Sequence, residues 1–212
     1  MTMVRGSGRL TWNRCSSACP YRGIHRLNLG TMDQPEIHFS VDIETAGPTP
    51  AEYAMLSIGA CLVSDPEKTF YCELQPDREA ADPEAMEIHG LSMDRLRAEG
   101  SPPAAAMQSF ADWIAENLPE NARPIFVALN AGFDWMFVND YFHRYLGRNP
   151  FGHNALDIKA IYMGLKRIAS VDALKVAINR DYPPERPLTH NALQDALDQA
   201  RLFSKIMDEL RS

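Results

Sequence analysis

The fold is decided by one short segment, Ile37-His38-Phe39-Ser40-Val41-Asp42-Ile43-Glu44-Thr45. Its alternation of apolar and polar residues predicts a β-strand, because successive side chains of a strand point to opposite faces. Asp42 and Glu44 then share one face, opposite to Ile43. Two neighbouring carboxylates on a central strand repel each other and lose hydration. A divalent cation, which prefers oxygen ligands, would offset that cost, so the segment points to a metal-assisted reaction.

The remaining pattern predicts an α/β domain of ordinary size. Strand-like runs cover residues 37–45, 53–63, 69–74, 123–129 and 155–158. Helical patterns begin near residue 83, with a break at 89–90, and continue at 102–118, 133–145, 161–168, from about 170 and at 191–210. A turn is expected at 64–67, where the residues favour turns. In the last helix the inner face is expected to consist of Leu193, Leu197, Ala200, Phe203, Met207 and Leu210.

Residues 1–32 differ from the rest of the chain in charge. They contain five arginines and no acidic residue, so that removing them from the net charge of −7 leaves −12 on residues 33–212. We therefore expect a basic, disordered extension followed by one domain over 33–212. Three interpretations of the extension stay open. It is either a disordered tail or an artefact of an upstream start codon, with translation beginning at Met32. Alternatively it is a basic arm that helps to hold nucleic acid, or a transit-type peptide, since such peptides are rich in Arg and Ser.

Four cysteines are too few for a disulfide scaffold in a chain of 212 residues. Cys15, Cys19 and His25 lack a fourth ligand at the usual spacing of a zinc site. Cys61 and Cys72 fall in strand patterns and are expected to be reduced core thiols. No apolar run approaches the roughly 18 residues of a membrane span. We expect a cytoplasmic protein without a membrane segment.

Three further residues carry chemistry when they are taken together with the strand pair. Asp134 follows the fourth strand at the start of a helix, where capping alone would explain it. Asp195 lies in the last helix, and alone it would be taken for a solvated residue. His190 precedes Asp195 by five residues, a separation of about 140° in a continuous helix. The two side chains can meet only if His190 lies in the turn before the helix, where it could act as a general base.

Three motifs in this order resemble those of the DEDDh 3′-to-5′ exonucleases, a group that includes RNase T, oligoribonuclease and polymerase proofreading subunits. They are Asp-Ile-Glu-Thr at 42–45, Asn-Ala-Gly-Phe-Asp at 130–134 and His-Asn-Ala-Leu-Gln-Asp-Ala at 190–196. A secondary match is Ile-His-Gly-Leu-Ser at 88–92. The resemblance covers about residues 37–210. Leu129 departs from it, because several relatives have a histidine or another polar residue before the asparagine.

The resemblance implies an RNase H-like α/β fold: a mixed five-stranded sheet in the order 3-2-1-4-5, with helices on both faces. It implies two divalent cations, Mg²⁺ or Mn²⁺, held by Asp42, Glu44, Asp134 and Asp195. The residues implied to act in catalysis are His190, as general base, and Glu44. The residues expected to contact substrate are Thr45, Ala46, Ile88, His89, Asn130 and Phe133.

The expected activity is metal-dependent hydrolysis of phosphodiester bonds at single-stranded 3′ ends, with release of nucleoside 5′-monophosphates by a two-metal mechanism. RNA or short oligonucleotides are slightly favoured over DNA. A net charge of −12 is poorly suited to long duplexes, which proteins bind largely by neutralising phosphates. The alternative is a non-catalytic nucleic-acid-binding or interaction module that keeps the fold. Homodimer formation is left open.

Overall fold

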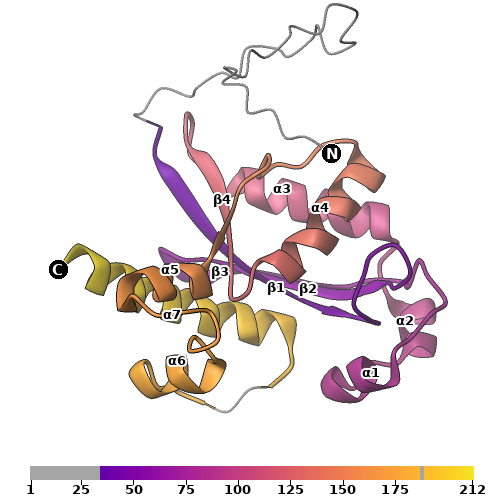
Figure 1. Ribbon diagram of the computed structural model, residues 1–212. Helices are drawn as coiled ribbons and strands as arrows, with labels where there is room; N and C mark the ends of the chain where they lie inside the picture. The colour runs from indigo at the N-terminus through magenta and orange to yellow at the C-terminus, as the bar shows by residue number, and fades with distance from the viewer. Residues whose placement is uncertain (1–33, 187–188) are drawn as a thin grey trace, which may run out of the picture. The chain divides into compact units, whose positions relative to one another are not determined.

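The computed structural model describes residues 34–186 and 189–212, so the predicted extension 1–32 and its cysteines lie outside the described residues. Figure 1 shows the arrangement of the elements. In chain order they are β1 (Glu36–Thr45), β2 (Met55–Leu62), β3 (Asp65–Glu73), α1 (Pro83–His89), α2 (Met93–Glu99), α3 (Pro103–Glu116), β4 (Arg123–Ala128), α4 (Gly132–Leu146), β5 (Ala155–Asp157), α5 (Ile158–Lys166), α6 (Lys175–Asp181) and α7 (Ala192–Arg211).

The five strands form one mixed sheet in the order β3-β2-β1-β4-β5, which confirms the predicted order. β2 runs antiparallel to β1 and β3, whereas β4 runs parallel to β1 and β5 runs parallel to β4. β1, with its two carboxylates, is therefore the central strand. The carboxyl ends of β1, β4 and β5 meet at one edge of the sheet, where α/β proteins commonly bind their ligands.

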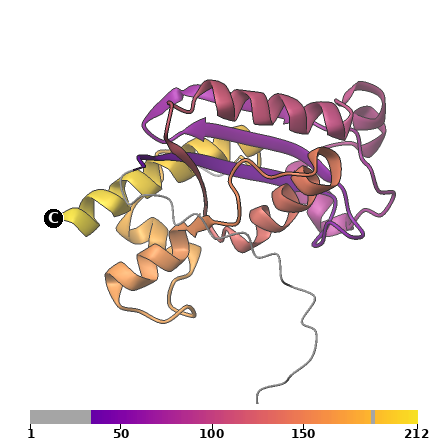
Figure 2. The same cartoon turned by 90° about the horizontal axis from the view of Figure 1, so that it is seen from above.

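Helices cover both faces of the sheet (Figures 1 and 2). α3 and α4 pack against the face that carries Phe39 and Val41, in the larger hydrophobic core. α5, α6 and α7 cover the opposite face, over Ile125 and Val127 of β4. Among the described residues, no helix combines the length and the apolar character needed to cross a membrane.

The first turns of α7 lie unusually close to β1 and β2. A Cβ atom added to Gly59 would lie only 2.1 Å from the backbone nitrogen of Leu193. Gly59 pairs directly with Asp42 across β1 and β2. Nearby, the Ser40 hydroxyl donates a hydrogen bond of 2.8 Å to the carbonyl oxygen of Ala196. The lack of a side chain at Gly59 thus allows α7 to approach the same sheet face that carries the acidic residues of β1.

The prediction for the inner face of α7 was wrong in part. Leu210 is 52% exposed, and Leu193 and Leu197 are only half-buried. The buried residues are Ala192, Asp195, Ala196, Gln199, Ala200, Phe203 and Ile206. This face contains two polar residues because it lies over Asp42, where an apolar stripe would leave that carboxylate without a partner.

Several element boundaries also differ from the predictions. The turn between β2 and β3 consists of residues 63–64, and Asp65 already pairs with Leu62. α5 begins at Ile158 because the Asp157 carboxylate caps it, accepting hydrogen bonds from two backbone N–H groups. α6 begins at Lys175 rather than near residue 170. These differences arise from local capping and pairing, which apolar periodicity does not reveal.

Gly59→Ala is expected to lower the free energy of unfolding by about 1–3 kcal/mol, because the new methyl group would meet α7 backbone that cannot move without disturbing the sheet. The matched control is Gly164→Ala in α5, where nothing lies within 4 Å of the added Cβ. Alanine there should be neutral or stabilising. Thermal unfolding of both variants would check this, and equal melting temperatures would contradict it.

Candidate active site

Three carboxylates from distant parts of the chain converge at the end of β1. One oxygen each of Asp42, Glu44 and Asp195 lies within 4.8 Å of the others. β1 supplies the first two from one face, and the docking of α7 supplies the third. At such a separation, two unit charges repel by roughly 3–4 kcal/mol at an effective dielectric constant of about 20. The arrangement therefore favours either a bound cation or protonation.

The pKa values of this cluster are raised, and the cause is mainly burial. Burial raises the pKa of Asp42 well above its ordinary value, and the charges of Asp134, Glu44 and Asp195 add to the effect. Burial and the charge of Asp195 raise the pKa of Glu44 to about 7. The pKa of Asp195 is also raised by burial, against the opposing charge of Lys175.

Asp134 lies in the first turn of α4 and is 5% exposed. Burial raises its pKa to about 8, although hydrogen bonds from its own backbone and that of Ile43 oppose this. It lies outside the trio that meets within 4.8 Å but close enough to Asp42 to influence it. All four predicted ligands are thus brought to one place.

The donor set fits a hard divalent cation. Such ions take oxygen ligands, and carboxylates are the usual ones. The Oδ1 atom of Asp195 is buried and has no hydrogen-bond partner among the described residues. A buried carboxylate oxygen without a partner is costly, and a cation between Asp195, Asp42 and Glu44 would satisfy it.

Gln199 holds Asp42 in place, a role that the sequence analysis missed. Its Nε2 donates a hydrogen bond of 2.5 Å to Asp42, and its Oε1 accepts one of 2.7 Å from the Leu129 backbone. The side chain thus connects α7 with the ends of β1 and β4. The signal was available, because Gln199 stands four residues after Asp195 and so on the same helix face.

His190 lies where the sequence analysis required, in the turn before α7. It has a left-handed backbone with φ of 49° and precedes the N-cap residue Asn191. Its side chain is exposed, and its positive charge, when present, lowers the pKa values of both Asp195 and His89. Arg186 ties the preceding segment to α7 through hydrogen bonds of 3.1 Å and 3.0 Å to Asp198.

Two of the predicted substrate contacts, Thr45 and Ala46, lie in one turn, and a third, His89 of α1, contacts that turn. Thr45 is buried, and its hydroxyl donates to the Gly47 carbonyl oxygen. Ala46 is fully buried, and its N–H donates to Ala54. His89 accepts from the Leu91 N–H at Nδ1 and lies 3.2 Å from the Thr45 carbonyl at Nε2, which makes Nε2 the protonated nitrogen. We now expect the side chains of Thr45 and Ala46 to support the turn rather than to touch substrate.

The other predicted contacts are exposed. Ile88 is 55% exposed and Phe133 is 36% exposed. Met136, which follows Phe133 by three residues and is equally exposed, was missed. The Asn130 side chain is exposed as well, and its backbone N–H donates to Asp157. Trp135, between Phe133 and Met136 in the sequence, packs edge-on against Phe126.

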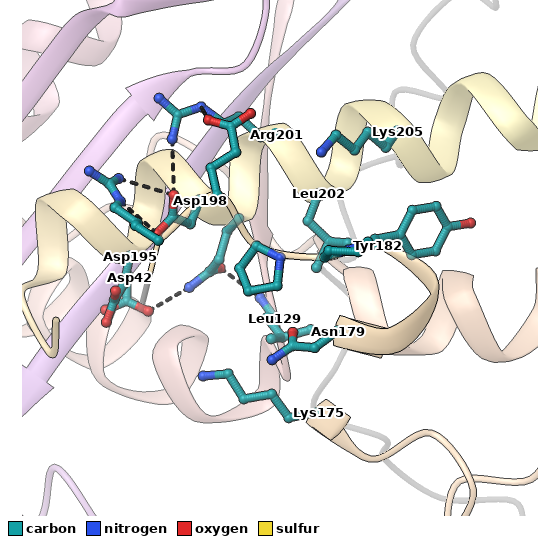
Figure 3. A pocket seen from close by; sticks show the side chains of 15 residues that line it. Asp42, Leu129, Lys175, Asn179, Tyr182, Asp195, Asp198, Arg201, Leu202 and Lys205 are labelled. Carbon is teal, nitrogen blue, oxygen red and sulfur yellow. Dashed lines mark hydrogen bonds and ion pairs between the residues drawn. The ribbon is translucent and has the colours of Figure 1, made fainter. Parts of the chain in front are cut away.

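A pocket of about 290 Å³ opens beside Asp42 and Asp195, between α6, α7 and the intervening segment. Figure 3 shows it from close by. Leu129 and Gln199 are among the residues that line it. Leu129 is the residue that departs from the family pattern, so this departure falls on the pocket wall rather than among the carboxylates.

In protein stripped of divalent ions, the melting temperature should fall as the pH rises from 5 to 8. The pKa values of Glu44 and Asp134 are raised to about 7 and about 8 in the folded chain, so above pH 5 the folded chain still holds protons that the unfolded chain has already lost, and the stability that they provide disappears as the pH rises through these values. Added Mg²⁺ replaces those protons, so its stabilising effect should grow over the same range. We expect a gain of at least about 3 °C at pH 8. Calorimetric scans showing an equal gain at pH 5 and pH 8 would contradict this.

Gln199→Ala should weaken Mg²⁺ binding by about 10–100-fold, because Asp42 loses the group that orients it. The matched control is Gln194→Ala, on the same helix, whose side chain forms no hydrogen bond with the described residues. Titration of the melting temperature with Mg²⁺ measures both. Unchanged Mg²⁺ dependence in Gln199→Ala would show that the contact is not needed.

Comparisons with known proteins identify the family of the chain. Residues 37–207 match the family described as the 3′-5′ exoribonuclease Rv2179c-like domain. The chain is 46% identical over 175 residues to the 3′-5′ DNA exonuclease Cap18 of Escherichia coli, covering 82% of this chain and 93% of that protein. It is 28% identical over 179 residues to ribonuclease T of Yersinia enterocolitica, covering 79% and 83%.

Solved structures of low sequence identity share the fold. The nuclease domain of 3′hExo, a DEDDh family member solved with rAMP, has a TM-score of 0.67 at 14% identity, with 81% of this chain and 92% of that chain covered. Exonuclease I of E. coli, solved with a dT13 oligonucleotide, has a TM-score of 0.63 at 16% identity, with 82% and 40% covered. The chain belongs to the Rv2179c-like 3′-5′ exoribonuclease domain family, and it shares its fold with a DEDDh exonuclease.

Proposed function

We propose that the chain removes nucleoside 5′-monophosphates from single-stranded 3′ ends with two divalent cations, Mg²⁺ or Mn²⁺, and His190 as general base. The observation that carries the proposal is the convergence of Asp42, Glu44 and Asp195, with Asp134 beside them and His190 in the turn before α7. Asp42, Glu44 and Asp195 would hold one ion, and Asp42 and Asp134 the other. Residues 33–212 would form the catalytic domain of a cytoplasmic enzyme.

The ions, when bound, supply an activated water and stabilise charge on the leaving 3′ oxygen. The protein's own part is to position and to transfer a proton. The exposed imidazole of His190 can approach a water at the cluster and accept its proton. The exposed faces of Ile88, Phe133 and Met136 offer apolar surface on which a terminal base can stack, a contact that tolerates any base.

RNA or short oligonucleotides are the substrates that we propose first, in agreement with the exoribonuclease description of the family. DNA is the second candidate. The relative that is 46% identical is described as a DNA exonuclease, and this supports it. Turnover of matched 5-mer and 20-mer ribo- and deoxyribo-oligonucleotides would separate the two. The net charge of −12 on 33–212 disfavours long duplexes of either kind.

The central test follows a 5′-labelled oligonucleotide, from which a 3′-5′ exonuclease produces a ladder of products shortened from the 3′ end. Asp42→Asn should reduce the rate to background. His190→Ala should reduce kcat by about 10²–10⁴-fold, the usual contribution of a general base. The controls are Asp208→Asn on α7 and His143→Ala on α4, both exposed and remote from the cluster. Wild-type activity in Asp42→Asn would remove the proposed mechanism.

A further inference from the structure

One wall of the pocket beside Asp42 has no role in the site described so far, and it is basic. Four of its lining residues carry a positive charge: Lys175, Arg186, Arg201 and Lys205. Apart from Asp42 and Asp195, only Asp198 and Glu185 oppose them there. The four cations and four carboxylates of the whole lining balance, so the wall away from Asp42 and Asp195 carries an excess of two positive charges, in a part of the chain whose net charge is −12. A cation-lined wall next to an acidic cluster suits an anionic group of the substrate.

The four basic residues are not equivalent. Arg186 pairs with Asp198 at 3.0 Å, and Arg201 pairs with Asp198 at 3.0 Å and with Glu185 at 3.8 Å. These two arginines are therefore occupied in holding the segment before α7. Among the ion pairs formed within the described part of the chain, neither Lys175 nor Lys205 takes part. The two lysines are available to a ligand.

Lys175 is the lysine nearer to the acidic cluster. Among the charged groups that shift the pKa of Asp195, Lys175 has the largest effect, and it lowers that pKa. No carboxylate oxygen of Asp195 lies within ion-pair distance of Lys175. Figure 3 shows its side chain extending toward Asp42, with Lys205 at the far end of the pocket. Asn179 follows Lys175 by four residues and lines the same wall, as helical spacing requires. Lys175 therefore lies in the same pocket as Asp195 without forming an ion pair with it.

The other flank of the cluster carries Ile88, which is part of the apolar surface assigned above to the terminal base. Ile88 and His89 belong to α1, and Lys175 belongs to α6. In Figure 1, α1 and α6 lie to either side of the first turns of α7, which carry Asp195. A strand whose last base lies on the α1 flank and whose scissile phosphate lies over the carboxylates would continue toward α6. The next anionic group that it presents is the phosphate of the preceding nucleotide.

We propose that Lys175 binds the phosphate on the 5′ side of the nucleotide that precedes the scissile bond, inside the pocket lined by Asn179, Gln199 and Lys205. This inference rests on the proposed exonuclease function and names a specificity-determining residue for it. The pocket volume of about 290 Å³ is at the lower end for small-ligand sites, which suits one phosphate and its sugar. An ammonium group binds phosphate as a point charge from any direction, so an exposed lysine is sufficient.

A pair of dinucleotides isolates this contact. A dinucleotide with a 5′-hydroxyl has a scissile phosphate but no phosphate 5′ of the preceding nucleotide, whereas its 5′-phosphorylated form has both. The wild-type protein should hydrolyse the phosphorylated form with a kcat/KM higher by about tenfold, the effect of one charge-assisted contact. Lys175→Ala should lose this gain while keeping its rate on the hydroxyl form. Lys175→Arg should retain part of it.

The matched control is Lys68→Ala in β3, an exposed lysine outside the pocket, which should keep the full gain. Because Lys175 is exposed, its replacement should leave the melting temperature unchanged. Equal wild-type rates on the two dinucleotides would overturn the proposal. An equal loss of kcat/KM on both dinucleotides in Lys175→Ala would also overturn it, because that result would place the lysine at the scissile phosphate.

Binding measurements distinguish a failure of the phosphate site from a failure of the proposed exonuclease function. Calorimetric titration of both dinucleotides into His190→Ala in Mg²⁺ measures the preference for the 5′-phosphate without turnover, and Lys175→Ala in that background should remove it. If the wild-type protein hydrolyses neither dinucleotide but this preference is found, the exonuclease function fails and the phosphate site stands. If it hydrolyses both equally and binding shows no preference, the phosphate site fails alone.

Discussion

The close contact between the first turns of α7 and the face of β1 and β2 is the constraint on which the rest of the site depends. Gly59 leaves room for the α7 backbone directly beside Asp42, and the Ser40 hydroxyl holds the carbonyl of Ala196. This contact brings Asp195 to within 4.8 Å of the two carboxylates of β1. The same turns place Gln199 against Asp42 and begin immediately after His190. One helix therefore contributes the proposed metal ligand Asp195, the side chain of Gln199 that supports Asp42, and the position of the proposed base His190.

This contact brings together carboxylates that repel one another, and protonation and neighbouring polar groups offset part of that repulsion. Burial raises the pKa values of Asp42, Glu44 and Asp134, so without cations the folded chain retains protons there. Gln199 donates a hydrogen bond to Asp42, and the charge of Lys175 acts on Asp195. Such a cluster stores unfavourable energy that a divalent cation releases on binding. Stability and metal affinity are coupled because the same carboxylates determine both.

The two flanks of the cluster differ in character. On the α1 flank, Ile88 offers exposed apolar surface beside the hydrogen-bonded pair of His89 and the Thr45 carbonyl. On the α6 flank, lysines and paired arginines line a pocket. A single nucleic-acid strand has both kinds of group, with bases that stack and phosphates that need cations. The asymmetry gives the site a direction, which an enzyme that acts from one end of a strand requires.

From the sequence, local alternation placed Asp42 and Glu44 on one face of β1. The strand order, the central position of β1, and the candidate roles of the acidic residues and of His190 were implied by the resemblance of three short motifs to those of a known family, because the motifs keep their order along the chain. The inner face of α7 could not be predicted, because Asp195 and Gln199 are buried only where Asp42 lies opposite. The roles of Gly59, Gln199 and Lys175 were decided by the tertiary structure. Each depends on which backbone or charge from a distant segment lies next to it, and sequence spacing carries no information about that contact.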